Sequence, residues 1–474
     1  MNILLVHPYF LFDRQHEENI EAPPMGLHYL AAACLAAGHR VTLANWSQVY
    51  KEPQVVARTL RELAPDVVGV SILHGNRWGG LDVAEAVKDL LPGTPVVFGG
   101  VGATFLARQL LEHFPCVDYV VRGEAERIFP ALLASLTADA DPADVPGLSF
   151  RRDGAVLETP DAPLVMDLDT LPMPAEHYSF PYLALTRGCP GRCTFCGSPR
   201  LWGPRVRFHS PAYFTRQMAL LRERGVRFFY VSDDTFTLQR AAVLEVCERI
   251  LREGLDVTWA AISRVDRVDP EVLAMMRRAG CVQISYGVES GSPEMRKALG
   301  KHISDEQIER AFRLTTAHGI LARAYIIYGS PGESDATIQA SIDTLMRIKP
   351  LVTLFHVLSV FPGTALHDRA VAAGTLDERR WLERGEDVLW FELDPAMNGE
   401  RVLAWGKRLK QAYFEALPGF ADTIELVESP GLAPFQADFL SRLGMTFERG
   451  DYAQLLQPTE REALASRLYR RALD

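Results

Sequence analysis

Apolar strand segments alternate with helical segments over most of the first 370 residues, and this alternation is the feature that most limits the fold. In the N-terminal third the strand segments are continuous apolar runs, which is typical of strands buried on both faces of a sheet. We expect strands at 2–6, 40–46, 66–73, 95–100 and 117–123. Because helical segments separate these runs, the sequence predicts an α/β fold that begins with a doubly wound parallel sheet.

A second series of strand–helix repeats begins at residue 182. Its strand segments, with the polar residues that follow them, are 182–186, 227–237, 257–266, 282–292, 322–334 and 352–366. Six such repeats predict a partial (β/α)6 barrel, with its chemistry at the carboxyl ends of the strands.

A chain of 474 residues is too long for one ordinary core, and the composition indicates where it divides. We expect a first domain over 1–140, an Asp-, Pro- and Gly-rich linker with one small hairpin over 141–181, and the barrel over 182–370. The rest, 371–474, loses the barrel rhythm and is expected to be a helical domain that caps the active site.

Charge and hydropathy exclude several classes of function. A net charge of -10 argues against a nucleic-acid surface, because phosphate binding needs a basic stripe. The N-terminal apolar run is short and follows no basic region, and no stretch approaches the roughly 18 apolar residues that span a bilayer. We therefore expect a cytoplasmic protein with reduced thiols and no membrane partner.

Three of the seven cysteines lie close together in the sequence TRGCPGRCTFCGSP, with the spacing Cys189-x3-Cys193-x2-Cys196. A disulfide framework is disfavoured by the odd number of cysteines, and a zinc site by the lack of a nearby fourth ligand. Three thiolates can hold three irons of a [4Fe–4S] cluster and leave the fourth iron open to a ligand. This spacing after a strand, with Phe195 before the last cysteine, resembles the radical S-adenosylmethionine (SAM) superfamily.

The resemblance implies that SAM binds the open iron through its amino and carboxylate groups. It also implies SAM contacts at the strand ends, where Asp233 or Asp234 and Glu289 would bind the amino group or the ribose, and Arg264 or Arg323 the carboxylate. The full expected set of SAM contacts is Phe195, Ser232, Asp233, Asp234, Arg264, Glu289, Ser290, Arg323, Gly329 and Phe361. The alternative for each of these residues is an ordinary polar or salt-bridged strand end.

The N-terminal sheet resembles the Rossmann-like cobalamin-binding domain. Ser71 and Leu73 match that family's Ser-x-Leu stretch, and Gly99 and Gly100 match its Gly-Gly stretch. Its Asp-x-His-x-x-Gly stretch is missing, so we expect cobalamin without a protein histidine on cobalt; His7, His16 and His74 are the alternative ligands. The expected cobalamin contacts are Pro24, Met25, Gly26, Ser71, Ile72, Leu73, Gly99, Gly100, Val101, Gly102, Arg122, Gly123 and Glu124. A vestigial sheet that binds no cobalamin is the alternative.

Together the two resemblances imply a cobalamin-dependent radical SAM methyltransferase. Its cofactors would be a [4Fe–4S] cluster, SAM and cobalamin, as methylcobalamin or hydroxocobalamin, with a flavodoxin or ferredoxin as electron donor. It would methylate an unactivated carbon of a small molecule, whose identity the sequence does not indicate. A cyclase or ring-rearranging enzyme of the same family is the runner-up, and a noncatalytic iron–sulfur or cobalamin carrier is a further alternative. A methylthiotransferase is disfavoured because only Cys34 and Cys116 precede the cluster loop.

Overall fold

The computed structural model describes residues 1–11, 25–49, 52, 54–385, 387 and 389–473. The chain forms two compact units, each drawn from several stretches of sequence. The first unit consists of Met1–Phe180, Phe195–Arg207 and Ser359–Phe391, and the second of Pro181–Thr194, Phe208–Leu358 and Glu392–Asp474. Among the described residues, no helix is long and apolar enough to cross a membrane.

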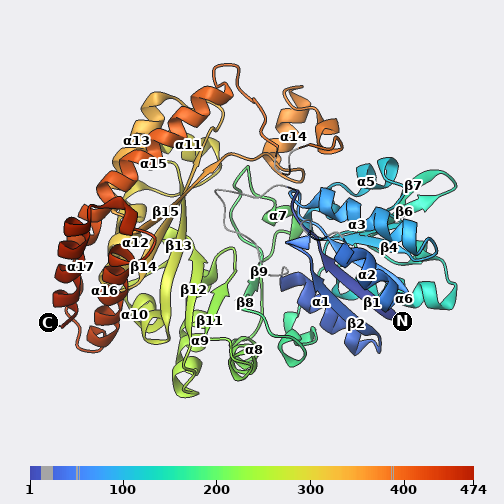
Figure 1. Ribbon diagram of the computed structural model, residues 1–474, viewed down its shortest axis with the longest axis horizontal. Coiled ribbons are helices and arrows are strands. Elements are labelled where there is room, and N and C mark those ends of the chain that lie inside the picture. The colour runs from blue at the N-terminus through green and yellow to red at the C-terminus, as the bar shows by residue number, and fades with distance from the viewer. Residues whose placement is uncertain (12–24, 50–51, 53, 386, 388, 474) are drawn as a thin grey trace. The chain divides into compact units, whose positions relative to one another are not determined.

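A seven-stranded sheet organises the first unit, with the strand order β2-β1-β3-β4-β5-β6-β7 (Figure 1). The strands are β1 (Asn2–His7), β2 (Arg40–Asn45), β3 (Val67–Ser71), β4 (Val96–Gly99), β5 (Tyr119–Val121), β6 (Leu148–Arg152) and β7 (Ala155–Glu158). The first five are parallel, which confirms the predicted doubly wound sheet. The chain adds β2 on one side of β1 and then β3, β4 and β5 on the other, so a crevice for ligands is expected between β1 and β3 at their carboxyl ends.

Helices connect the parallel strands. They are α1 (Met25–Ala36), α2 (Gln54–Leu63), α3 (Arg77–Leu90), α4 (Val101–Phe105), α5 (Ala107–His113) and α6 (Ala125–Ala138). The buried face of α1 packs with β1, β3 and α6 in one apolar core, and this core includes Cys34, as expected for a small packed residue.

The expected linker over 141–181 is instead part of the first unit. Its hairpin, β6 and β7, extends the sheet, because β6 pairs antiparallel with β5. Leu148 and Phe150 are buried, and the Phe150 ring lies 5.8 Å from that of Tyr119. Composition was misleading here, since a few apolar residues among Asp, Pro and Gly are sufficient for an edge hairpin.

A six-stranded parallel sheet with the order β15-β14-β13-β12-β11-β8 forms the second unit, which confirms the predicted partial barrel. Its strands are β8 (Tyr182–Leu183), β11 (Phe228–Val231), β12 (Thr258–Ser263), β13 (Cys281–Glu289), β14 (Leu321–Tyr328) and β15 (Val352–Val357). The helices between them are α8 (Pro211–Glu223), α9 (Arg240–Arg252), α10 (Pro270–Arg278), α11 (Pro293–Ala298), α12 (Asp305–Ala317) and α13 (Asp335–Ile348). Two short strands, β9 (Thr186–Arg187) and β10 (Arg207–Phe208), and the helix α7 (Ser198–Leu201) flank the cysteine stretch.

After β15 the chain contributes residues to both units, so the expected boundary at 370 differs from the structure. The stretch Ser359–Phe391, with α14 (Ala365–Ala372), belongs to the first unit. The buried Arg77 side chain holds it there, because its guanidinium donates to the carbonyls of Trp381 at 3.0 Å and Asp387 at 2.7 Å.

The remaining tail is helical, as predicted: α15 (Gly399–Asp422), α16 (Ala433–Glu448) and α17 (Pro458–Leu473). Helix α15 lies along β14 and β15, where Tyr413 contacts Phe355 with ring centroids 5.7 Å apart. In α16, Gln436 donates at 3.1 Å to the carbonyl of Ala317, just before β14 begins. Helix α16 therefore packs at the amino end of this strand.

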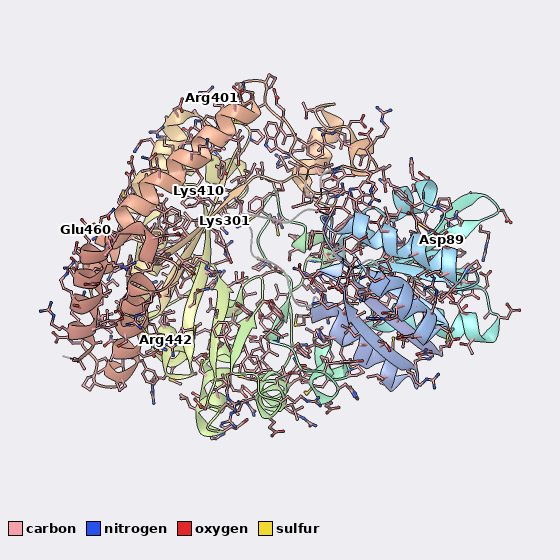
Figure 2. All side chains as sticks on the ribbon, in the orientation of Figure 1. Asp89, Lys301, Arg401, Lys410, Arg442 and Glu460 are labelled. Carbon is pink, nitrogen blue, oxygen red and sulfur yellow. The ribbon has the colours of Figure 1, made fainter. Side chains whose placement is uncertain are left out.

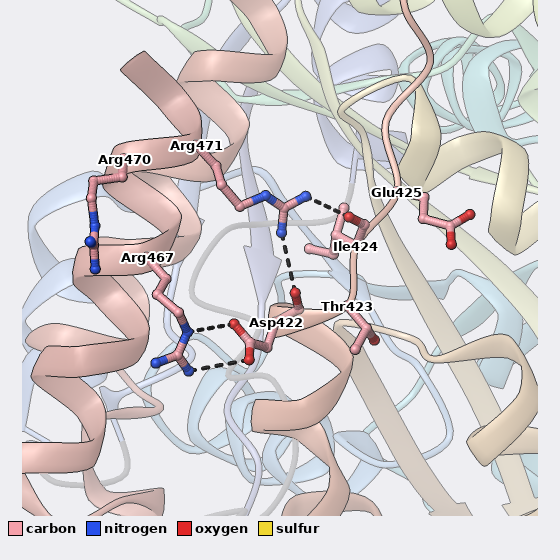
Figure 3. A pocket seen from close by; sticks show the side chains of 7 residues that line it. All are labelled: Asp422, Thr423, Ile424, Glu425, Arg467, Arg470 and Arg471. Atoms are coloured by element: carbon pink, nitrogen blue, oxygen red, sulfur yellow. Dashed lines mark hydrogen bonds and ion pairs between the residues drawn. The ribbon is translucent and has the colours of Figure 1, made fainter. Parts of the chain in front are cut away.

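Arginines of α17 attach it to the end of α15 (Figure 3). Arg467 binds both carboxylate oxygens of Asp422 at 2.8 and 3.2 Å, and Arg471 donates to the carbonyls of Asp422 and Ile424. Cations near the C-terminus of a helix complement its dipole, so these contacts stabilise the last turn of α15.

Candidate functional site

The loop after β9 places the first two cysteines around a glycine. The Cys189 Sγ accepts a hydrogen bond from the Gly191 amide at 3.4 Å and lies 3.6 Å from the Thr235 hydroxyl. A Cβ added to Gly191 would lie 3.3 Å from the Cys189 Sγ and 3.9 Å from the Cys193 Sγ. The two thiols therefore face one small space, which a larger residue at 191 would fill.

The third cysteine, Cys196, lies in the stretch Phe195–Arg207 that belongs to the first unit. All three cysteines are only partly buried. Within the described part of the chain, no three His, Cys, Asp or Glu side chains are arranged to hold a metal ion. The structure thus brings Cys189 and Cys193 together, and the role of Cys196 as the third ligand remains a prediction.

Asp233 supports the cysteine loop from within the protein. This buried carboxylate accepts hydrogen bonds from the Leu185 amide at 3.0 Å and the Thr186 hydroxyl at 2.5 Å. Burial raises its pKa to about 7, against the opposing effect of these hydrogen bonds. Both oxygens are occupied, so Asp233 fixes the strand before Cys189 instead of facing SAM as expected. Its exposed neighbours Ser232 and Asp234 remain predicted contacts.

A buried ion pair lies beside Cys193. Glu289 ends β13 with a φ of 66°, and its Oε1 is 3.0 Å from the Nζ of Lys301 (labelled in Figure 2). Burial raises the pKa of the Cys193 thiol, Lys301 and Arg264 lower it, and Glu289 raises it. Glu289 is therefore near the cysteines, as expected, and Lys301 is a further neighbour that no sequence pattern indicated.

The turn that carries Lys301 abuts the cysteine loop. The Thr194 amide donates to the Leu299 carbonyl at 2.9 Å, and a Cβ on Gly300 would lie 2.6 Å from the Arg192 carbonyl oxygen. No local pattern identifies Lys301, because only this tertiary contact brings it to the site. Ser290 is buried and serves the turn: its carbonyl accepts from Arg296 at 2.9 Å.

The two candidate arginines differ in position. A guanidinium nitrogen of Arg264 would lie 3.6 Å from a Cβ on Gly191, and its Nε binds Asp266 at 2.9 Å. Arg264 is thus at the cysteine loop, as expected. Arg323 is the third residue of β14, toward the amino end of that strand, and its charge acts on Tyr413 and Tyr452. That environment does not favour a contact with SAM.

A tight turn follows β14. Gly329 has a φ of 82°, which favours glycine, and its amide donates to the Glu333 carboxylate. The Ser330 amide donates to the same carboxylate oxygen at 3.2 Å. Burial raises the pKa of Glu333 to about 7.

In the first unit the two cobalamin-type stretches lie against each other at the carboxyl ends of β3 and β4. The Ile72 amide donates to the Gly99 carbonyl at 2.8 Å, and the Gly102 amide donates to the Ile72 carbonyl at 3.1 Å. A Cβ on Gly100 would lie 2.6 Å from the Ile72 oxygen, and one on Gly102 would lie 2.6 Å from the Leu73 carbonyl carbon. Glycine is therefore required at both positions for the loops after β3 and β4 to pack this closely against each other.

The polar side chains after β5 bind other groups of the protein. Glu124 forms a buried ion pair with Arg207 at 2.7 Å and accepts from the Val165 amide at 2.8 Å. Arg122 binds Asp161 at 3.0 Å. We expected both residues to contact cobalamin, but their side chains bind Asp161 and Arg207 instead.

The remaining predicted cobalamin contacts are Gly123, which follows β5, and three residues at or just before the start of α1. The Gly123 amide donates to the Thr104 hydroxyl at 3.0 Å. Met25 and Gly26 begin α1, whereas Pro24 and His16 lie outside the described residues.

A pocket of about 290 Å³ opens at the same edge. It brings together residues expected to contact different cofactors: Leu73 and Val101 for cobalamin, and Phe195 and Phe361 for SAM. The complete lining is Phe10, Leu73, His74, Gly75, Val101, Phe195, Gly197, Phe361, Pro362 and Thr364. The lining is mainly apolar, and Phe10 is a member that no sequence pattern indicated.

Two family models match the chain in the order of its two sheets. The B12 binding domain matches residues 19–133, and the Radical SAM superfamily matches residues 183–345. An uncharacterized methyltransferase of Pyrococcus horikoshii is 29% identical over 427 residues, which cover 87% of this chain and 92% of that protein. An anaerobic magnesium-protoporphyrin IX monomethyl ester cyclase of Synechocystis is 28% identical, over 86% of this chain and 85% of its own.

Solved structures share the whole fold. The radical SAM methyltransferase TsrM from Kitasatospora setae, with tryptophan and a SAM analogue bound, has a TM-score of 0.73 at 19% identity and covers all of both chains. The cobalamin-dependent radical enzyme OxsB, with aqua-cobalamin and SAM bound, has a TM-score of 0.65 at 18% identity, covering all of this chain and 71% of its own. Because both family models match one chain in the order of its two sheets, the chain combines a B12 binding domain with a domain of the Radical SAM superfamily, and its fold agrees with that of these solved structures along its whole length.

Proposed function

We propose that the protein is a cobalamin-dependent radical SAM methyltransferase that methylates an unactivated carbon of a small molecule. The observation that carries the proposal is the presence on one chain of a cysteine loop at a barrel edge and a glycine-lined edge of a doubly wound sheet. When bound, the cluster with SAM supplies a 5′-deoxyadenosyl radical, and cobalamin supplies a transferable methyl group.

The cysteine loop fits a [4Fe–4S] cluster. Cys189, Cys193 and Cys196 would be its ligands, and Gly191 keeps open the space that the first two thiols face. Arg264 and Lys301 place positive charge beside the Cys193 thiol, which stabilises its thiolate against the cost of burial.

The charges beside the loop also fit the methionine part of SAM, which carries one ammonium and one carboxylate. Glu289 can accept from an ammonium group, while Lys301 and Arg264 can donate to a carboxylate. Because Glu289 and Lys301 already neutralise each other, a zwitterion can replace their mutual contact with two new ones.

The edge of the seven-stranded sheet fits a large flat ligand. Gly100 and Gly102 let the loops after β3 and β4 pack closely into one edge, and the neighbouring pocket is lined mainly by apolar side chains that exclude water. The role of these residues is to bind and orient cobalamin, not to act on it chemically.

Several relatives support methyl transfer. Besides the Pyrococcus protein, they include a hopanoid C-3 methylase of Methylococcus capsulatus and a cytidylyl-2-hydroxyethylphosphonate methyltransferase of Streptomyces wedmorensis. The tryptophan in the TsrM structure supports a small-molecule substrate. An external one-electron donor such as flavodoxin or ferredoxin would reduce the cluster.

The cyclase relatives favour a second candidate, a ring-forming radical reaction without methyl transfer. Product analysis separates the two. The anaerobically reconstituted, cobalamin-loaded protein is reduced and given SAM, and 5′-deoxyadenosine and S-adenosylhomocysteine are quantified by mass spectrometry. Methyl transfer predicts both products, with S-adenosylhomocysteine lost in a cobalamin-free preparation. Release of 5′-deoxyadenosine alone would favour ring formation, and release of neither would overturn both proposals.

A further inference from the structure

The cysteine loop lies in a basic stretch of an acidic chain. Between Glu176 and Glu223 the sequence contains seven arginines and no Asp or Glu, whereas the whole chain has a net charge of -10. The sequence around the proposed cluster ligands therefore carries positive charge that no acidic neighbour along the chain offsets.

Two further segments of the second unit contact this loop. The Thr194 amide donates to the carbonyl of Leu299, just after α11, at 2.9 Å. The Arg264 guanidinium lies beside Gly191 and donates to the His302 carbonyl at 3.4 Å. We call the surface formed by residues 190–194, 264–267 and 293–302 the cysteine-loop face.

The exposed charged side chains of the cysteine-loop face are mainly cationic. Arg192, Arg267 and Lys297 are exposed. Within these three segments, all of which the structure describes, Glu294 is the one exposed acid. The carboxylate of Asp266 is only partly exposed and lies 3.8 Å from the Arg267 Nε. The face therefore presents net positive charge to the solvent.

Arg192 also lies where the proposed cluster is nearest to the surface of the loop. It directly precedes Cys193, and its side chain is exposed whereas the cysteine is partly buried. Because electron transfer slows steeply with distance, a carrier that docks at Arg192 is well placed to reduce a cluster held by this loop.

We propose that the cysteine-loop face is the docking site of the electron donor, and that this donor is a small protein with acidic side chains around its redox group. The inference rests on the proposed function, because it requires a cluster at this loop. Complementary charge accelerates encounter and orients the partner, while the net negative charge of the chain disfavours an acidic donor elsewhere. The step moves one electron: the donor is oxidised, the cluster is reduced, and no bond forms or breaks.

Two reductants of opposite charge test the proposal on the full-length, reconstituted protein. One is an acidic flavodoxin kept reduced by its reductase and NADPH, and the other is reduced methyl viologen, a small cation that needs no docking site. The rate of cluster reduction is followed by absorbance under anaerobic conditions, and 5′-deoxyadenosine release is measured with SAM. With flavodoxin, added salt should slow reduction of the wild type, because salt screens the attraction.

Charge-reversal variants locate the surface. In Arg192→Glu/Lys297→Glu the second-order rate constant with flavodoxin should fall by about 10-fold or more and lose its decrease with salt. Arg192→Gln/Lys297→Gln should show a smaller loss. Arg252→Glu/Arg278→Glu is the matched control, since it reverses two exposed arginines at the ends of α9 and α10 and should retain the wild-type rate. With methyl viologen, all of these proteins should be reduced at least as fast as the wild type.

The outcomes separate this inference from the proposed function. If flavodoxin reduces the wild type and the reversed variant equally fast, or does not reduce the wild type, the docking inference fails. It also fails if the control loses as much as the variant, or if the variants lose reduction by methyl viologen as well. If the wild type releases no 5′-deoxyadenosine with either reductant, the proposed function fails too.

Discussion

The carboxyl edge of the six-stranded sheet carries charged side chains, whereas the stretches after β3 and β4 of the seven-stranded sheet carry glycines, apolar residues and one neutral imidazole. Glu289, Lys301 and Arg264 lie around the cysteine loop of the first of these edges. Gly100, Gly102 and His74 lie at the carboxyl edge of the seven-stranded sheet. Both edges are formed by the carboxyl ends of parallel strands, but the side chains at the two edges differ in charge.

The difference corresponds to the ligands that we propose. A zwitterion and an anionic cluster need opposite charges held at fixed positions, and buried charges are tolerated only when they are paired. A broad, flat macrocycle needs close approach to the backbone and little competing charge. Disturbing each edge should therefore produce a different kind of defect.

The largest effect on stability is expected from the charged edge. Lys301→Met leaves the Glu289 carboxylate buried and unpaired, so the free energy of unfolding should fall by about 3–5 kcal/mol. The double variant Lys301→Met/Glu289→Gln should recover most of this loss, because it leaves no buried charge. Denaturant unfolding measures both. Arg240→Met, which removes an exposed ion-paired arginine, is the control and should change little. Equal losses in the single and double variants would contradict the role of the pair.

At the neutral edge, we expect stability and cobalamin binding to depend on the close packing of the loops after β3 and β4. Gly102→Ala brings a Cβ within 2.6 Å of the Leu73 carbonyl carbon and should cost about 1–3 kcal/mol of stability. Because the loop must shift, cobalamin should also bind at least about 10-fold more weakly, a change of about 1.4 kcal/mol. Equilibrium dialysis measures the affinity. Gly93→Ala is the matched control, since a Cβ there has no neighbour within 4 Å. Identical affinity in both variants would argue against binding at this edge.

The buried carboxylate of Glu333 should give the charged edge a pH dependence. Its pKa is about 7 in the folded protein and 4.5 as the ordinary value, so the folded state binds more protons between these values. Stability from this group is complete below pH 4.5 and is lost as pH rises toward 7 and above. Relative to Glu333→Gln, the wild type should therefore lose up to about 3 kcal/mol over that range. Parallel stability curves for the two proteins would refute this.

Removing a charged side chain far from either edge should have the smallest effect on the free energy of unfolding. Arg467→Ala removes the pair with Asp422 at the end of α15, and the free energy of unfolding should fall by about 1 kcal/mol or less. Added salt should reduce the difference further, because the pair is exposed. A loss as large as that of Lys301→Met would mean that exposure does not distinguish these pairs.

Both sheets and the residue stretches at their edges could be predicted from the sequence, because periodicity and glycine placement are local signals. Neighbours brought by tertiary contacts could not. Lys301 reaches the cysteine loop only through the turn at Leu299–Gly300, and Phe361 contacts His74 only because the stretch after β15 belongs to the first unit.

Polar residues at strand ends were the main source of error. Asp233 and Glu124 are in the expected places, but their carboxylates bind Thr186 and Arg207 within the protein. Sequence cannot distinguish a side chain that waits for a ligand from one that has an internal partner. Composition had the same limit at 141–181, where a hairpin of the sheet resembles a linker.

The central claim is that three cysteines hold a cluster that cleaves SAM. Anaerobic assays with reduced, reconstituted protein would measure 5′-deoxyadenosine from the wild type and from Cys189→Ala, Cys193→Ala and Cys196→Ala. Cys247→Ala, at a buried cysteine of α9, is the matched control. The account predicts release by the wild type and the control and none by the three loop variants. Release by any of these three variants would contradict it.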